Sequence, residues 1–265
     1  MARPVVAVVC ALEEEGIHLR KLLKNDVESQ DRVGNRITVG EIDKSESSPL
    51  VRLIICGIGA ENAALATSLA LMEKDAPSCV ISYGCAGSHS EDLHVGDTVI
   101  VSSVVPLDAH VLNREGNKVF SGFRQSLQDI PVMTLDCDAF LLDQAKAAAK
   151  RAALPAWPGN VRAPVVKTGK CGSTQVWTQQ QSVLRAISKS RGTICEEMEA
   201  ASVAWCCRRF SVPFIAVKDI SNNELHKGTS TGDHAGSGDI LDNAQVGMRA
   251  AIIVHELLSS YKVKS

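Results

Sequence analysis

The sequence is poor in aromatic side chains and has no excess of positive charge. Phe, Trp and Tyr make up 4% of the 265 residues, and 28 Lys and Arg stand against 30 Asp and Glu, a formal net charge of −2. This composition offers no basic stripe for nucleic acid or an anionic membrane surface. Hydrophobic residues make up 45% of the chain, enough for a sizeable core. These proportions favour a globular protein with a small-molecule ligand.

Patterned metal and disulfide motifs are also missing. The nine cysteines contain no C-x-x-C pair, which argues for reduced thiols rather than a disulfide framework or a zinc site. The seven histidines include no H-E-x-x-H, and His226, Asp233 and His234 lack ligand-like spacing, so no metal is expected. No run approaches the roughly 20 apolar residues of a membrane span, and acidic residues stand where a signal peptide would need a cleavage site. We expect a cytoplasmic protein.

Short β-branched runs alternate with amphipathic stretches along the chain. Strands are expected at residues 4–12, 36–42, 51–57, 79–84, 97–105, 164–169 and 212–220, and helices at 60–74, 137–152, 196–210 and 242–262. Several of the strands are apolar on both faces, as strands between two helix layers are. The alternation predicts one domain over residues 1–265 of class α/β, a three-layer α/β/α arrangement with a central mixed, largely parallel twisted sheet.

The stretch "CEEMEAASVAWCCRRF" (195–210) places three glutamates before an apolar helical pattern. Thr193 with Glu196 fits a capping box, and Glu196 and Glu197 suit the first turn of a helix. Glu199 is harder to explain, because its neighbours three, four and seven residues on are small or apolar. A carboxylate on such a face needs a partner or a ligand.

Two glycine-containing segments follow predicted strands. "CGIGAENAA" (56–64) begins as G-x-G, but Asn62 stands where the dinucleotide fingerprint needs Gly or Ala, so no nicotinamide cofactor is expected. "YGCAGSH" (83–89) is interpreted as a small-residue turn that either lets backbone amides approach a ligand or only reverses the chain. In "GSTQVWTQQ", Trp177 either stacks on a flat ligand or fills a gap. The polar stretch 222–238 is expected to be a mobile loop over a site or a plain surface loop.

Read in order, these pieces resemble a known family. "CALEEEG", "CGIGAENAA", "YGCAG" with "HVGDTVIV", "GSTQVW", "EEMEAASVAW" and "VPFIAVKDIS" are similar to the nucleoside phosphorylases of the purine and uridine phosphorylase type. Within that family they look most like the methylthioadenosine and S-adenosylhomocysteine nucleosidases. The resemblance runs from Val5 to Leu258, and it implies the nucleoside phosphorylase fold, a nucleoside substrate and a homodimer whose pocket is often completed by the neighbouring subunit.

The resemblance also implies roles for individual residues. Glu15 would activate the attacking water, and Glu199 would bind the ribose hydroxyls. Purine-cleaving relatives carry a proton-donating aspartate directly after "I-S", where this chain has Asn222, an amide that donates a hydrogen bond but no proton. Asp219 is expected to face away if its strand is regular. The remaining substrate-binding residues that the resemblance implies are Leu12, Ile58, Cys85, Ala86, Gly87, Trp177, Glu197, Met198 and Ser221.

Charge favours water over phosphate as the nucleophile. The family's phosphorylases supply arginines where this chain has Ser82 and the acidic "LEEEG", and carboxylates repel phosphate. We therefore expect hydrolysis of a purine nucleoside without a cofactor, with a base preference altered by Asn222. Two alternatives stay open: a phosphorylase of purine nucleosides or uridine, and a non-catalytic nucleoside-binding or storage protein.

Overall fold

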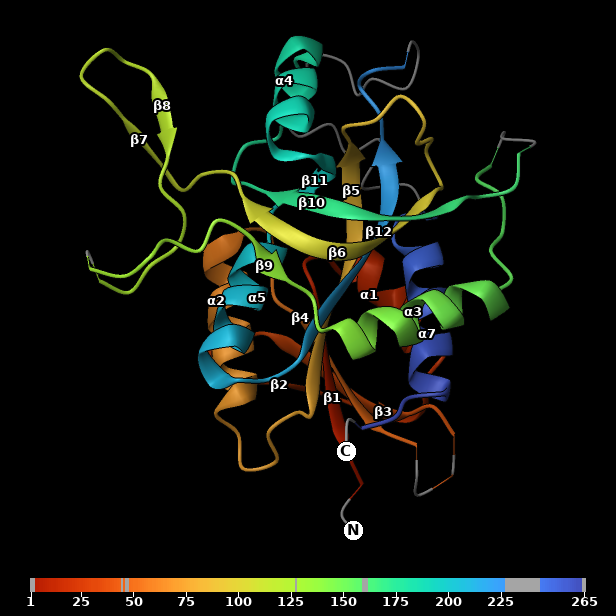
Figure 1. Ribbon diagram of the computed structural model, residues 1–265. Coiled ribbons are helices and arrows are strands. Elements are labelled where there is room, and N and C mark those ends of the chain that lie inside the picture. The colour runs from red at the N-terminus through yellow and green to blue at the C-terminus, as the bar shows by residue number, and fades with distance from the viewer. Residues whose placement is uncertain are drawn as a thin grey trace.

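The computed structural model describes residues 3–43, 45, 48–126, 128–158, 162–226 and 244–263. Its centre is a ten-stranded mixed sheet with the strand order β11-β10-β6-β12-β5-β1-β4-β3-β2, to which β9 adds by pairing with β6 (Figure 1). A separate hairpin, β7 and β8, projects from it. The strands are β1 Val5–Cys10, β2 Lys24–Gln30, β3 Arg36–Glu41, β4 Leu50–Ile55, β5 Cys79–Ser88, β6 Thr98–Pro106, β7 His110–Leu112, β8 Lys118–Phe120, β9 Leu135–Asp136, β10 Val166–Ser173, β11 Thr193–Glu197 and β12 Phe214–Asn222.

The central strands run parallel. β1 pairs in parallel with β4 and β5, β5 with β12, β6 with β10, and β10 with β11. The pairings of β6 with β12 and with β9, of β3 with β2 and β4, and of β11 with β5 are antiparallel. Because β11 returns to β5, the five strands β5, β12, β6, β10 and β11 form a closed ring, whereas β2 is left at an open edge.

Helices cover both faces of the sheet, so the α/β/α class is confirmed. α2 packs against α5 on one face, and α7 packs against α1 and α3 on the other (Figure 1). The helices are α1 Glu13–Arg20, α2 Ala60–Leu71, α3 Ala139–Arg151, α4 Gln181–Arg191, α5 Ala200–Phe210 and α7 Met248–Ser259. Among the described residues, no helix is both long and apolar enough to cross a membrane.

The core lies between the sheet and these helices. β1 and β12 are buried along almost their whole length, and the small residues of α2 and α5 let those two helices approach each other and the sheet closely. Cys206 and Cys207 lie in this core.

Two local expectations were wrong. Residues 196 and 197 belong to strand β11 and not to a helix, because pairing with β10 and β5 outweighs the local capping pattern. The helix starts at Ala200. "YGCAGS" is likewise no turn: β5 continues through it to Ser88, with Gly84 at φ 144°.

Candidate active site

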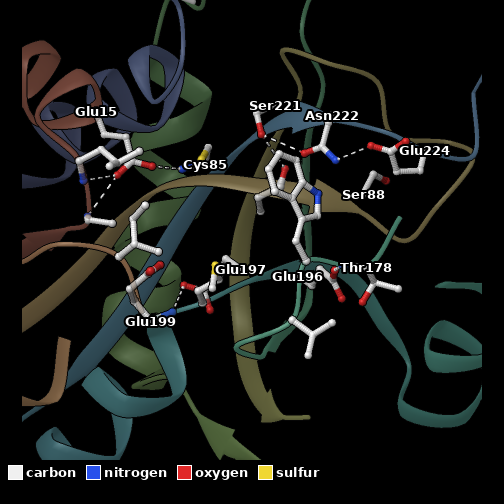
Figure 2. Close-up of a pocket in the computed structure, with 18 of the residues that line it drawn as sticks. Glu15, Cys85, Ser88, Thr178, Glu196, Glu197, Glu199, Ser221, Asn222 and Glu224 are labelled. Atoms are coloured by element: carbon white, nitrogen blue, oxygen red, sulfur yellow. Dashed lines mark hydrogen bonds between the residues drawn. The ribbon is translucent and has the colours of Figure 1, made fainter. Parts of the chain in front are cut away.

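One pocket with a cavity volume of about 250 Å³ lies where β1, β5, β11 and β12 end near the N-termini of α1, α2 and α5. All twelve site residues expected from the sequence line it, from Leu12 to Asn222. Figure 2 shows Glu15 and Glu199 reaching in from opposite walls at one end, with Asn222, Glu224, Thr178 and Glu196 toward the other. The pocket therefore has a carboxylate end and a mixed amide and carboxylate end.

Glu15 is buried on the first turn of α1, and three backbone N–H groups hold its carboxylate. Oε2 accepts from the amides of Ala11 and Leu12 at 3.2 and 3.1 Å, and Oε1 accepts from Cys85 at 2.8 Å. A side chain at Gly84 would leave no room, because a Cβ there would lie 2.5 Å from Oε1. A carboxylate offers about four acceptor positions, so this one is fixed in place and can still accept from a water in the pocket.

Glu199 is the N-terminal cap residue of α5, and its carboxylate reaches across to the start of α2. Oε1 accepts from the amide of Gly59 at 2.7 Å. Burial, together with the nearby charge of Glu197, raises the pKa of Glu199 to about 7, although Lys218 acts in the opposite direction. The side chain lies on the pocket surface, so a hydroxyl-bearing ligand could supply the partners that its position requires.

Glu197 anchors the backbone beneath Glu199. Its carboxylate accepts from the amides of Glu199 and Ala200, and it pairs with the buried ammonium of Lys218 at 2.9 Å. Burial lowers the pKa of Lys218, but the charges of Glu197, Glu199 and Glu15 raise it by more, so it stays above its usual value. Lys218 therefore remains a cation and holds the glutamates in one arrangement. The sequence analysis did not identify it, because its partners come together only in the fold.

A β-bulge in β12 directs Asn222 into the pocket. The register with β5 shifts between Ile220 and Asn222, so that Asn222 lies opposite Gly87. Gly87 makes room for the amide, because a Cβ there would lie 3.2 Å from Nδ2. Ser221 donates from Oγ to the Asn222 Oδ1 at 3.1 Å, and the Asn222 Nδ2 donates to Glu224 Oε1 at 3.2 Å.

Asp219 faces away from the pocket, as expected for a regular strand up to the bulge. It is fully buried and accepts from the amides of Arg249 and Ala250 at the start of α7, and from the hydroxyl of Thr98. Burial raises the pKa of Asp219 to about 7, despite the opposing charge of Arg249. Its role is to cap a helix, and it does not replace the acid that Asn222 lacks.

The sequence analysis missed two pocket carboxylates, Glu196 and Glu224. Glu196 was expected to cap a helix, but it accepts from the amide of Thr178 at 2.8 Å and pairs with the buried ring of His89 at 2.9 Å. His89 also bonds the Thr193 hydroxyl, so the expected capping box is wrong. Glu224 stands in the turn after β12, where no local pattern marks it.

Among the described residues, neither a metal-binding cluster nor an ionised thiol is found at this pocket. Within the described residues, no group of three or more His, Cys, Asp or Glu could hold a metal ion; His226 Nε2 donates to the carbonyl of Glu91, while Asp233 and His234 lie outside those residues, as do residues 227–238 of the expected loop. Burial, and then the charge of Glu15, raises the pKa of Cys85 well above its usual value. Cys85 therefore stays a thiol and is a poor nucleophile.

Comparison with known proteins agrees with this fold. Residues 5–259 match the family model of the Phosphorylase superfamily, and the chain belongs to this family. It is 31% identical over 220 residues to a 5'-methylthioadenosine/S-adenosylhomocysteine nucleosidase of Marinomonas sp. (strain MWYL1). The matched region covers 82% of this chain and 85% of the relative. A nucleosidase of the same description from Oceanobacillus iheyensis is also 31% identical, over 225 residues, 83% of this chain and 87% of the relative.

A solved structure extends the likeness to three dimensions. The 5'-methylthioadenosine/S-adenosylhomocysteine nucleosidase of Neisseria meningitidis, in complex with methylthio-immucillin-A, has a TM-score of 0.75 and 25% sequence identity to this chain. The match covers 97% of this chain and 99% of that one. The resemblance seen in the sequence motifs is therefore confirmed over almost the whole protein.

Proposed function

We propose that this protein hydrolyses the N-glycosidic bond of purine nucleosides, with a 5′-methylthio or S-homocysteinyl group on the ribose. The observation that carries the proposal is the charge of the pocket. Five glutamates line it, and within the described residues no Arg, Lys or His does. Because carboxylates repel phosphate and stabilise a developing positive charge, water is the better nucleophile and an oxocarbenium-like sugar the better transition state.

Three residues would perform the reaction. Glu15, fixed by its three amides, would accept a proton from water as the water attacks C1′ of the ribose. Glu199 would accept hydrogen bonds from the ribose hydroxyls, and these bonds would strengthen as positive charge develops on the sugar. Asn222 would donate a hydrogen bond to N7 of the departing base while the C1′–N9 electron pair moves onto the base, which then takes its proton from solvent. Trp177 and Met198 would pack against the base and the ribose.

The test is release of free base from a panel of nucleosides with and without phosphate. Hydrolysis predicts release of adenine from 5′-methylthioadenosine in phosphate-free buffer at a rate that phosphate does not raise. Glu15→Gln is the control, and we expect it to lower kcat by roughly 10²–10⁴. It should also lower the free energy of unfolding, because its amide nitrogen cannot accept from the backbone N–H groups that both carboxylate oxygens now bind, so kcat is measured under conditions where the variant is folded. Dependence on phosphate would identify a phosphorylase. Binding without turnover of any nucleoside would identify a storage or binding protein.

The proposal extends to assembly and compartment. Ile58 and Val176 line the pocket yet are 47% and 60% exposed, and after Ile58 the chain also exposes Leu65 on α2 and Met72 at its C-terminal cap. Apolar side chains at a pocket mouth are suited to burial by a second copy, so we assign a homodimer that completes the pocket. All nine cysteines are free, which favours a reducing compartment, the cytoplasm.

A further inference from the structure

The turn after β12 holds the pocket carboxylate of Glu224 next to Asn222. Asn223 is fully buried and donates from Nδ2 to the carbonyls of Ser90 and Leu93. Gln181 donates to the backbone carbonyl of Glu224 at 2.7 Å. These bonds fix the backbone on both sides of Glu224, a residue that is 4% exposed and lines the pocket. Its position is therefore set by the fold and not by a flexible surface loop.

The orientation of the Asn222 amide follows from its neighbours. An ionised carboxylate only accepts, so the group facing Glu224 Oε1 must be the amide nitrogen, and the Asn222 oxygen then receives the Ser221 hydroxyl. The wall consequently presents an N–H donor and a carboxylate acceptor whose heavy atoms are 3.2 Å apart. The amide nitrogen carries a second hydrogen that a ligand can receive.

An adjacent donor and acceptor match one kind of purine edge. Adenine presents the N7 acceptor next to the N6 amino donor, whereas guanine presents N7 next to the O6 acceptor. If the Asn222 nitrogen donates to N7, the acceptor beside it meets the substituent at C6. An amino group there gives Glu224 a hydrogen bond, whereas a carbonyl oxygen would face a carboxylate with no proton between them.

We propose that Glu224 is a specificity-determining residue that accepts a hydrogen bond from the 6-amino group of the purine base while Asn222 donates to N7. In this arrangement two side chains share the contacts that a single carboxyl group could make. Asn222 contacts N7, and Glu224 contacts the amino group at the neighbouring position 6. This inference rests on the proposed function. Glu196 lines the same pocket but is already bonded to His89 and the Thr178 amide, so it does not compete for this role.

The test compares 5′-methylthioadenosine with 5′-methylthioinosine, which differ in the 6-substituent and in the hydrogen that the 6-oxo base carries on N1. The wild-type protein is expected to favour the 6-amino substrate in kcat/KM by on the order of 10² or more, because the 6-oxo substrate leaves polar groups mismatched. Glu224→Gln offers both an oxygen and an N–H, so we expect it to reduce this ratio at least about tenfold, about 1.4 kcal/mol, and Glu224→Leu should also reduce it. Glu196→Gln is the matched control and should leave the ratio where it is.

A second measurement does not depend on turnover. Calorimetric affinities for adenine and hypoxanthine should show the same preference in the wild-type protein and its loss in Glu224→Gln. A wild-type preference for the 6-oxo substrate, or a ratio unchanged in both Glu224 variants, would overturn the role of Glu224. Absence of any base release would instead refute the proposed function, and the two base affinities would still decide the inference.

Discussion

At the scale of single residues, Glu199 links pH to activity. Its pKa is raised to about 7 by burial and by Glu197, and Lys218 limits the shift. The ionised form is the acceptor that ribose binding needs, so we expect kcat/KM to fall about tenfold per unit as pH drops below about 7. Glu199→Gln should lower kcat/KM by on the order of 10² or more and remove this dependence on Glu199. The measurement is the pH profile of kcat/KM for the wild type and for Glu199→Gln.

The same shift has a defined sign for stability. The folded-state pKa of Glu199 lies above the unfolded value, so folding favours the protonated form. The stabilising contribution of protonated Glu199 is fully present below the pKa of the unfolded chain, roughly 4.3, and is lost as pH rises through about 7. Urea unfolding at pH 8 should therefore find Glu199→Gln no less stable than the wild type. A large loss of stability would mean that Glu199 mainly holds α5 to α2.

Asn222 provides the second prediction at this scale. In Asn222→Asp the new carboxylate would stand next to Glu224, and two adjacent carboxylates share a proton because both cannot easily ionise. The pair could then supply the proton that the amide cannot. We expect adenine-nucleoside cleavage to rise by roughly tenfold, about 1.4 kcal/mol, with a benefit that grows as pH falls. Equal turnover in both forms would contradict this, and a steady-state comparison across pH decides it.

At the scale of elements, the bulge in β12 separates two tasks. Before it, Asp219 caps α7 through the amides of Arg249 and Ala250; after it, Asn222 enters the pocket. Asp219→Ala should lower the free energy of unfolding by about 2–3 kcal/mol, because it removes a cap and leaves buried donors without partners. Asp138→Ala, which removes the cap of the more exposed α3, should cost about 1 kcal/mol. Equal losses of unfolding free energy for the two variants in urea titrations would contradict the larger contribution expected from the buried Asp219.

The elements also show what the sequence could predict. Strands buried on both faces, such as β1 and β12, were found because their apolar runs are continuous. β2 is exposed along its whole length and carries no alternation, and only Leu184 of α4 is buried, so neither left a pattern to read. The pocket residues were found through the family motifs. Lys218 was missed because its partner, Glu197, lies on another strand that only folding brings near. Glu224 was missed because no local pattern marks the turn after β12.

At the scale of the whole molecule, the exposed apolar side chains at the pocket mouth lead to a prediction of assembly. Light scattering at micromolar concentration should give twice the monomer mass. Leu65→Glu, on the exposed side of α2, should shift this equilibrium toward monomer, because it would bury a charge in the interface. A stable wild-type monomer with full activity would contradict the homodimer, and a hexamer would favour the phosphorylase alternative.

The closed ring of strands has a consequence for how the protein opens. Each strand of the ring has a neighbour on both sides, whereas β2 pairs only with β3 and is exposed throughout. In hydrogen–deuterium exchange we expect β2 amides to exchange through local fraying and those of β5 and β12 only through global unfolding. Since the ring closes at Gly87 and Glu196, two pocket residues, a bound ligand should slow exchange there most. The pocket would then occupy the most slowly opening part of the molecule.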